Sequence, residues 1–303
     1  MCSLKHKGGS DPIMMTGKAK DVGFDQSEHL TNAQLRDRAI GARYADRRMA
    51  ANYSKLYSRS DSVGRFLQSR LHVVSGALAG VPGGNLLDVG CGPGMMVRNL
   101  LDTRPGAFHI VAVDRSLAMI EACITRIGDD DGARALTART EALPFENDSF
   151  DVVLAMGVLE YTDFSTALAE IARVTRAGGR VVVTMHNPLS PYRLTERYVY
   201  GPALGVLRTL MKTIKSRSVR RRSRAPLQIY AVRERRLREA MQRVGLLPLE
   251  SLYFDVTFTL PPLDRYVRKW NRRWQTNLEV TVGQSWRKFF GTAYMIVAQA
   301  VNS

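Results

Sequence analysis

Residues 85–96 read NLLDVGCGPGMM, a pattern that few folds accommodate. An apolar run leads into Asp88, and Gly90, Gly92 and Gly94 follow at every second position. Glycine lets the backbone adopt positive φ and lets a ligand approach the main chain closely. The helical spacing after the turn places free N–H groups of a helix N-terminus beside it, where they can bind a carboxylate or a phosphate. The stretch therefore predicts a strand, a ligand-binding turn and a helix in succession.

Short apolar runs alternate with helical patterns from residue 85 to residue 185. The runs NLLDVG, FHIVAVD, FDVVLAM and GRVVVTM read as buried parallel strands, and ARALTA as a weaker one. The segments MMVRNLLD, LAMIEACITRI and DFSTALAEIARVTR have helical spacing and lie between these strands. This alternation predicts an α/β fold with a mostly parallel sheet covered by helices on both faces.

Two acids narrow the class of ligand that the turn accepts. Asp88 precedes the glycines, where a carboxylate would repel a pyrophosphate and attract an ammonium or a sulfonium. Asp114 ends the second predicted strand, where an acid can accept hydrogen bonds from both hydroxyls of a ribose. The alternative for Asp114 is a helix N-cap. S-adenosylmethionine, with an amino-acid end, a sulfonium and a ribose, meets both conditions.

Four motifs resemble those of class I S-adenosylmethionine-dependent methyltransferases, above all the small-molecule enzymes similar to ubiquinone and menaquinone biosynthesis methyltransferases. The motifs are LLDVGCGPG, VAVDRSLAMIEAC, EALPFENDSFDVVLAMGVLEY and RVTRAGGRVVV, in the family's order. The resemblance implies a Rossmann-like fold with a mostly parallel seven-stranded sheet, helices on both faces and a C-terminal antiparallel strand. It covers residues 80–187 well, and REAMQRVGL and GTAYMIVAQA more faintly.

The resemblance also assigns a cofactor site for S-adenosylmethionine, with S-adenosylhomocysteine as the product. The methionine end would lie against Asp88 and the glycine turn, the ribose against Asp114, and the adenine between neighbouring side chains and backbone. The cofactor-binding residues that it implies are Asp88, Gly90, Gly92, Gly94, Asp114, Arg115, Met119, Thr140, Glu141 and Met156. Arg139 stands where relatives often carry an aspartate that receives the adenine amino group. Arginine has no acceptor, so that contact is absent here or is made by Glu141 or a main-chain carbonyl.

Residues for the transfer step are expected at the ends of the fourth and fifth predicted strands. His186 is the candidate general base because its pKa lies near neutrality; the alternative is a histidine that only binds backbone. Glu160, Tyr161 and Tyr192 are candidate substrate-binding residues. Tyr44 and Tyr53 lie on N-terminal helices that often fold over the cofactor in relatives, and we assign both to core packing. No His, Cys or Asp cluster has the spacing of metal ligands, so no metal is predicted.

The chain divides into segments of different character. In order, they are a loose N-terminal tail (1–25), an N-terminal helical segment (26–80), the cofactor-binding core (81–187), a basic amphipathic insertion or lid (188–230), and the C-terminal part of the fold (231–303) with a second irregular basic segment (259–290). Three cysteines without a spacing pattern suit a cytoplasmic protein.

The net charge of +16 indicates an anionic partner, and the alternative is a solvated basic surface without one. Seven basic residues and no acid fall between Lys212 and Arg224, after a stretch, 202–215, with apolar and basic faces. This insertion fits a lid over the substrate or a helix on an anionic membrane surface. The stretch RYVRKWNRRW interleaves arginine with Trp270 and Trp274, which also suits stacking on RNA bases.

We therefore expect a methyltransferase acting on an O, N or C nucleophile of a small, amphipathic or acidic metabolite such as a quinone, lipid or natural product. The alternative is an RNA-modifying methyltransferase whose basic segments bind the phosphate backbone. The sequence leaves the acceptor atom and the oligomeric state open.

Overall fold

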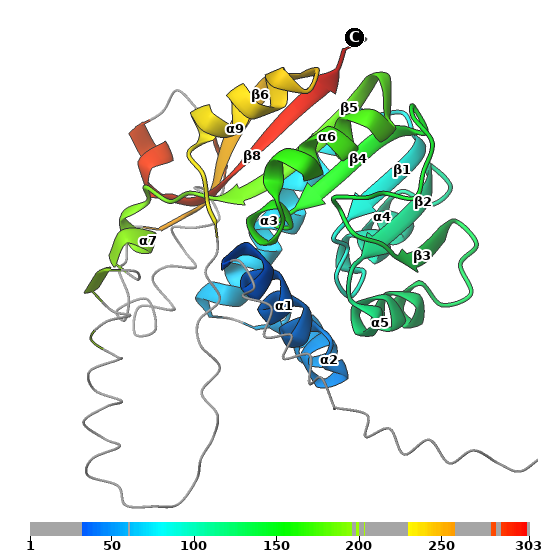
Figure 1. The fold of residues 1–303 in the computed structure, drawn as a ribbon, viewed down its shortest axis with the longest axis horizontal. Coiled ribbons are helices and arrows are strands. Elements are labelled where there is room, and N and C mark those ends of the chain that lie inside the picture. The colour runs from blue at the N-terminus through cyan, green and yellow to red at the C-terminus, as the bar shows by residue number, and fades with distance from the viewer. Residues whose placement is uncertain are drawn as a thin grey trace, which may run out of the picture.

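The protein was studied as a computed structural model, which describes residues 32–59, 61–195, 198–199, 203, 230–257, 280–282 and 286–301. Its centre is an eight-stranded sheet with the strand order β3-β2-β1-β4-β5-β8-β6-β7 (Figure 1). The tail 1–25, the stretch 202–215 apart from Ala203, the arginine-rich run after it, and Trp270 and Trp274 lie outside the described residues.

Five parallel strands form the first part of the sheet, and three helices connect them. The strands are β1 (Gly84–Val89), β2 (Phe108–Asp114), β3 (Ala133–Thr137), β4 (Phe150–Met156) and β5 (Thr175–His186). The helices are α4 (Met95–Thr103), α5 (Leu117–Ile127) and α6 (Phe164–Val174), and a short 3-10 turn, η1 (Leu159–Tyr161), follows β4. Each predicted strand and helix of this region is confirmed within a few residues.

The C-terminal part completes the sheet. It contains α9 (Glu234–Arg243), β6 (Leu246–Val256), β7 (Val280–Val282), η4 (Trp286–Phe290) and β8 (Gly291–Ala300). Strand β8 runs antiparallel between β5 and β6, with His186 opposite Ala293 and Arg180 opposite Gln299. The seven-stranded sheet with its antiparallel C-terminal strand is thereby confirmed, and β7 adds a short eighth strand at the edge of β6. Of segment 259–290, β7 and η4 are the described parts.

Three helices precede the first strand: α1 (Asn32–Tyr44), α2 (Arg47–Leu56) and α3 (Ser62–Leu78). The Asp46 side chain accepts a hydrogen bond from Arg48 N, and that of Asp61 accepts one from Gly64 N, so carboxylates cap α2 and α3. Helix α3 packs on the sheet, whereas α1 and α2 lie below the ends of the central strands, where α2 contacts α5 and α1 contacts α2 (Figure 1). A short helix, α7 (Pro191–Thr195), follows β5.

Two apolar cores lie on opposite faces of the sheet, because successive side chains of a strand point to opposite sides. In β4, Val153 and Ala155 join the core beneath α6 and α9, and Val152 and Leu154 join the core beneath α3, α4 and α5. These β4 side chains are all fully buried, which explains why the strand reads as a continuous apolar run. Within the described ranges, no helix is both long enough and apolar enough to cross a membrane.

Candidate active site

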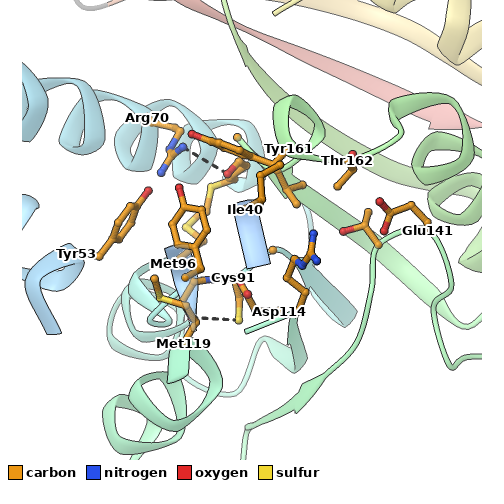
Figure 2. Close-up of a pocket in the computed structure, with 18 of the residues that line it drawn as sticks. Ile40, Tyr53, Arg70, Cys91, Met96, Asp114, Met119, Glu141, Tyr161 and Thr162 are labelled. Carbon is orange, nitrogen blue, oxygen red and sulfur yellow. Dashed lines mark hydrogen bonds between the residues drawn. The ribbon is translucent and has the colours of Figure 1, made fainter. Parts of the chain in front are cut away.

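A pocket lies at the carboxyl ends of β1, β2 and β4, between those strands and the N-terminal helices (Figure 2). Its wall combines aromatic rings, backbone of the glycine turn and a few charged groups. The lining residues are Ile40, Tyr44, Tyr53, Tyr57, Arg70, Gly90, Cys91, Gly92, Met96, Asp114, Arg115, Met119, Thr140, Glu141, Met156, Gly157, Val158, Tyr161 and Thr162. Eight of the ten predicted cofactor-binding residues are therefore in this wall; Asp88 and Gly94 are not.

The glycine turn follows β1 as the sequence predicts, and a different structural requirement explains the glycine at each of its three positions. All three have positive φ: +70° at Gly90, +53° at Gly92 and +74° at Gly94. A Cβ at Gly90 would lie 2.5 Å from Val158 Cγ2, and one at Gly94 would lie 2.6 Å from Cys123 Sγ. A Cβ at Gly92 would meet no atom within 4 Å. Packing thus requires glycine at the first and third positions, and the second leaves its backbone open beside the pocket.

Asp88 lies buried at the end of β1, with no exposed surface. Neither of its carboxylate oxygens has a hydrogen-bond partner. Burial raises the pKa of Asp88 to about 7, against the lowering effect of Arg70. A buried carboxyl without a partner costs free energy, and a cationic ligand group nearby would remove that cost.

Asp114 joins the glycine turn to the pocket. Its Oδ2 accepts the Gly92 N–H at 3.0 Å, and its Oδ1 accepts the Ser116 N–H at 2.8 Å. The N-cap of α5 is Ser116, whose hydroxyl accepts from Met119 N, so the N-cap alternative for Asp114 does not hold. Burial raises the pKa of Asp114, although the two backbone donors favour its charged form. A carboxylate has about four acceptor sites, so lone pairs remain for ligand hydroxyls.

An ion cluster lies beside the end of the pocket formed by Thr140 and Glu141. The Asp37 carboxylate of α1 is 2.5 Å from Arg115 Nη1 and 3.3 Å from Arg139 Nη1. Arg139, the departure from the family motif, also lies 3.6 Å from Glu141 Oε1. The hydrogen bond from Arg115 lowers the pKa of Asp37, with a smaller contribution from Arg139. Arg139 thus ties α1 to this edge of the pocket.

The predicted substrate-binding residues are not brought together. Tyr161 lines the pocket, where its ring packs edge-on against Tyr44. Glu160 is buried, and its Oε1 accepts the His186 N–H at 2.8 Å, so it joins η1 to β5. Tyr192 lies on α7, outside the pocket wall, with its ring 6.0 Å from the Arg193 guanidinium carbon.

His186 also lies outside the pocket wall. Its ring is 4.9 Å from the Phe66 ring, and its Nδ1 is 3.3 Å from Arg193 Nη2. Because a guanidinium only donates, Nδ1 is the acceptor and Nε2 carries the proton. Burial, with the charges of Arg193 and Arg70, holds the pKa of His186 well below its usual value. The imidazole is therefore neutral, and the lone pair of Nδ1 accepts a hydrogen bond from Arg193. The role of general base stays a prediction, and it requires Arg193 to move away from His186.

Two pocket residues, Tyr57 and Arg70, were not predicted from the sequence. Tyr44 and Tyr53 pack against a small apolar cluster, as expected, and in addition line the pocket. Arg70 is only 7% exposed. One signal could have identified it: Arg70 follows Leu67 by three residues and precedes Val74 by four, so it lies on the apolar face of its helix.

Comparison with known proteins agrees with this architecture. A family profile described as "Methyltransferase domain" matches residues 87–183. The chain is 35% identical over 135 residues to the demethylmenaquinone methyltransferase of Renibacterium salmoninarum, across 44% of this chain and 54% of the relative. It is 35% identical over 105 residues to the ubiquinone/menaquinone biosynthesis C-methyltransferase of Geobacter sulfurreducens, across 33% of this chain and 41% of the relative. The chain thus spans about half the length of these relatives.

Solved structures show the same fold at low sequence identity. A Thermotoga maritima protein described as an S-adenosylmethionine-dependent methyltransferase aligns with a TM-score of 0.54 and 17% identity, over 84% of this chain and 96% of its own. A Haemonchus contortus phosphoethanolamine N-methyltransferase aligns with a TM-score of 0.56 and 15% identity, over 90% of this chain and 61% of its own.

Residues 87–183 match the family described as a methyltransferase domain. In this region the chain is similar to demethylmenaquinone and ubiquinone/menaquinone biosynthesis methyltransferases, and the two solved methyltransferase structures share its fold.

Proposed function

We propose that the protein transfers a methyl group from S-adenosylmethionine to an O, N or C nucleophile of a small, amphipathic or acidic metabolite. The observation that carries this proposal is the buried, unpartnered carboxylate of Asp88 at the end of β1, directly before the glycine turn whose Gly90 and Gly92 line the pocket. A dinucleotide places a pyrophosphate at such a turn, which this carboxylate would repel. An amino-acid ammonium group is attracted there instead.

The remaining pocket residues suit the other parts of the cofactor. Asp114 has acceptor capacity left for the two ribose hydroxyls. Ile40 and Met119 are almost fully buried apolar side chains in the wall, and they would contact the adenine ring. Glu141, at the pocket's polar edge, would accept a hydrogen bond from the adenine amino group, in place of the aspartate that often accepts it in relatives. When bound, the cofactor supplies an electrophilic methyl group.

The protein's part in methyl transfer is to hold the acceptor close to the methyl group and in line with it. Tyr161, Tyr57 and Tyr53 present aromatic surface to the pocket, which suits a planar or apolar acceptor. The relatives named for demethylmenaquinone and ubiquinone/menaquinone biosynthesis support a quinone-type metabolite. Glu160, Tyr192 and His186 would act on the acceptor only after rearrangement of α7 and Arg193.

The test incubates the protein with methyl-tritiated S-adenosylmethionine and, in parallel, with extracted quinones, extracted lipids, polar metabolites and total RNA. We expect label in one small-molecule fraction, and much less label there with the variant Asp114→Asn at the same cofactor concentration. Label in RNA alone would replace this proposal with the RNA-modifying alternative. Calorimetric heat with a nicotinamide dinucleotide, and none with S-adenosylhomocysteine, would reject a methyltransferase altogether.

For the partner, we propose peripheral contact with an anionic membrane surface. Its support is the net charge of +16 together with exposed apolar side chains around α7 and η4. Leu189, Leu194 and Phe289 are 46%, 39% and 57% exposed. Co-sedimentation with phosphatidylglycerol vesicles, but not with phosphatidylcholine vesicles, is expected, and Phe289→Ala should weaken it. Ile124→Ala, which alters an equally exposed side chain of α5, is the control.

A further inference from the structure

Glu160 is a buried acid in η1, and its polar groups join three parts of the chain. Its carboxylate Oε1 accepts the N–H of His186, at the end of β5, at 2.8 Å. Its backbone carbonyl accepts the N–H of Tyr230, which precedes α9, at 3.2 Å. Glu160 is only 1% exposed. The carboxylate therefore has a fixed position beside the ends of β4 and β5, behind the pocket wall.

Two arginines from different helices face this carboxylate. Burial raises the pKa of Glu160, whereas the charges of Arg70 of α3 and Arg193 of α7 lower it. The Cζ atoms of the two arginines lie 5.5 Å and 5.7 Å from the centre of one ring, that of Phe66. Arg193 Nη2 is also 3.3 Å from His186 Nδ1. Two cations beside one ring repel each other, so the cluster depends on the negative charge of Glu160.

Arg70 and Glu160 meet at Gly157. A Cβ at this glycine would lie 2.4 Å from Arg70 Nη1 and 3.6 Å from Glu160 Oε2. Arg70 Nη1 is also 3.4 Å from the Met156 carbonyl oxygen, and its Nη2 donates to the Tyr57 hydroxyl at 3.2 Å (Figure 2). The guanidinium is thus held at the end of β4, in the pocket wall and beside the Glu160 carboxylate.

A second buried acid lies within the electrostatic reach of the same guanidinium. Burial and the charge of Asp114 raise the pKa of Asp88, and Arg70 opposes them. Yet neither oxygen of Asp88 accepts a hydrogen bond from any residue that the structure describes. Buried acids and buried arginines are normally paired, because an uncompensated buried charge is costly. An explanation for the unpartnered Asp88 is that Arg70 is held by Glu160 instead.

We propose that Glu160 is a positioning residue, which holds the Arg70 guanidinium at the end of β4 and so prevents it from pairing with Asp88. This inference rests on the proposed function, which requires the Asp88 carboxylate to be open to a cationic group. An ion pair between Arg70 and Asp88 would close that carboxylate. Because Arg193 faces the same acid, Glu160 also ties α7 to the pocket wall.

The first test needs no ligand. NMR of protein with ¹³C-labelled aspartate carboxyl groups follows the titration of Asp88, whose signal is assigned with Asp88→Asn. The native carboxyl should titrate at about 7. In Glu160→Gln the amide oxygen still accepts the His186 N–H, but Arg70 loses its counter-ion and turns to Asp88. The titration midpoint should then fall by about one pH unit or more, because a nearby cation favours the charged carboxylate.

Further variants show whether the effect passes through Arg70. Arg70→Met should raise the midpoint of Asp88, since it removes the cation that opposes burial. The double variant Glu160→Gln/Arg70→Met should not lower it. If Glu160→Gln does not fold, Glu160→Asp serves instead. Its carboxylate is one methylene farther from Arg70, so the midpoint should fall by a smaller amount.

Glu170 offers a matched control on α6, outside the pocket. It also accepts a backbone N–H, from Leu143 at 2.8 Å, and pairs with an arginine, Arg173, at 2.7 Å. Glu170→Gln should leave the midpoint of Asp88 unchanged. An unchanged midpoint in Glu160→Gln would overturn the inference. So would an equal fall in the double variant, because the charge of Glu160 would then act on Asp88 without Arg70.

The second test measures binding of S-adenosylhomocysteine by calorimetry at pH 8.5. Glu160→Gln should weaken binding about 10-fold, as one pKa unit of added pairing at Asp88 corresponds to that factor. Glu160→Gln/Arg70→Met should return to within about threefold of the native affinity, a rescue that a merely structural role of Glu160 would not give. Weakening without rescue contradicts the inference. Native protein that binds no S-adenosylhomocysteine would instead reject the proposed function, and the titration of ligand-free Asp88 would still decide the role of Glu160.

Discussion

The Asp114 carboxylate accepts the backbone N–H of Gly92 at 3.0 Å, which joins the end of β2 to the glycine turn after β1. The same acid also faces the pocket. One side chain therefore both fixes the shape of the turn and presents acceptor oxygens to a ligand. The structural and the ligand-binding roles of Asp114 are expected to be inseparable in any variant that alters its charge.

Asp114→Asn should raise the dissociation constant of S-adenosylhomocysteine by about 10-fold or more, because hydrogen bonds to a charged acceptor are lost. Calorimetry measures this directly. The matched control is Asp151→Asn, which changes another carboxylate that accepts a backbone N–H, from Asn85 at 2.8 Å, outside the pocket. Equal losses in both variants would show a general effect on the sheet.

Asp88 should couple cofactor binding to proton release. Its pKa is raised by burial to about 7 in the ligand-free protein, so below neutrality the carboxyl is protonated. A cationic group binding beside it favours the charged form and lowers that pKa. Binding of S-adenosylhomocysteine at pH 6 should therefore release a proton, and affinity should increase with pH toward 8. Calorimetry in buffers of different ionisation enthalpy counts the protons; the release should be absent in Asp88→Asn.

The same group should affect stability without ligand. The folded pKa lies above the unfolded value of 3.8, so the folded state binds more protons between about pH 4 and pH 7. The contribution of Asp88 to stability is then fully present below pH 4 and is lost as the pH increases through 7. Asp88→Asn should unfold at a higher temperature than the native protein at pH 8, and the difference should disappear near pH 4. Thermal unfolding at the two pH values tests this, and an unstable variant at pH 8 would contradict it.

The Asp37 cluster should hold α1 over the pocket. Asp37 pairs with Arg115 and Arg139, and its removal leaves two cations facing each other. Since the acid is 37% exposed, Asp37→Asn should cost less than about 1 kcal/mol of stability and about threefold in affinity for S-adenosylhomocysteine. Hydrogen exchange should increase in α1. Glu121→Gln, which breaks the exposed pair between Arg47 of α2 and α5, should leave exchange in α1 unchanged.

An ion pair between half-buried Arg65 and buried Asp255 should anchor α3 to the C-terminal strands. Arg65 Nε lies 2.6 Å from Asp255 Oδ1, and Asp255 also accepts from the Thr292 hydroxyl. Arg65→Met leaves a carboxylate buried without its cation, which should cost about 3–5 kcal/mol in urea unfolding. Arg47→Met, at a surface pair, should cost less than about 1 kcal/mol. A similar small cost at both sites would show that Asp255 is satisfied by Thr292 alone.

Local patterns explain why so much of the fold was predictable. The strands of the core are continuous apolar runs because both faces of the sheet are covered, and the glycines are required by the turn's own φ angles and neighbours. Asp88, Asp114 and the turn come from two adjacent strands whose ends meet in any parallel sheet. Their proximity therefore follows from strand order alone.

The sequence by itself determined the alternating sheet, the glycine turn and its two acids, because apolar periods mark the strands and helices and the ends of adjacent parallel strands meet at one edge of the sheet. Only the tertiary structure decided the rest of the pocket wall. Arg70 and Tyr57 reach it through the packing of α3 and α2, and Asp37 meets Arg139 across 102 residues of chain. Such contacts depend on how the helices pack on the sheet, which the spacing of apolar residues along the sequence does not predict. For the same reason the Glu160 carboxylate accepts the backbone N–H of His186, and neither residue lines the pocket.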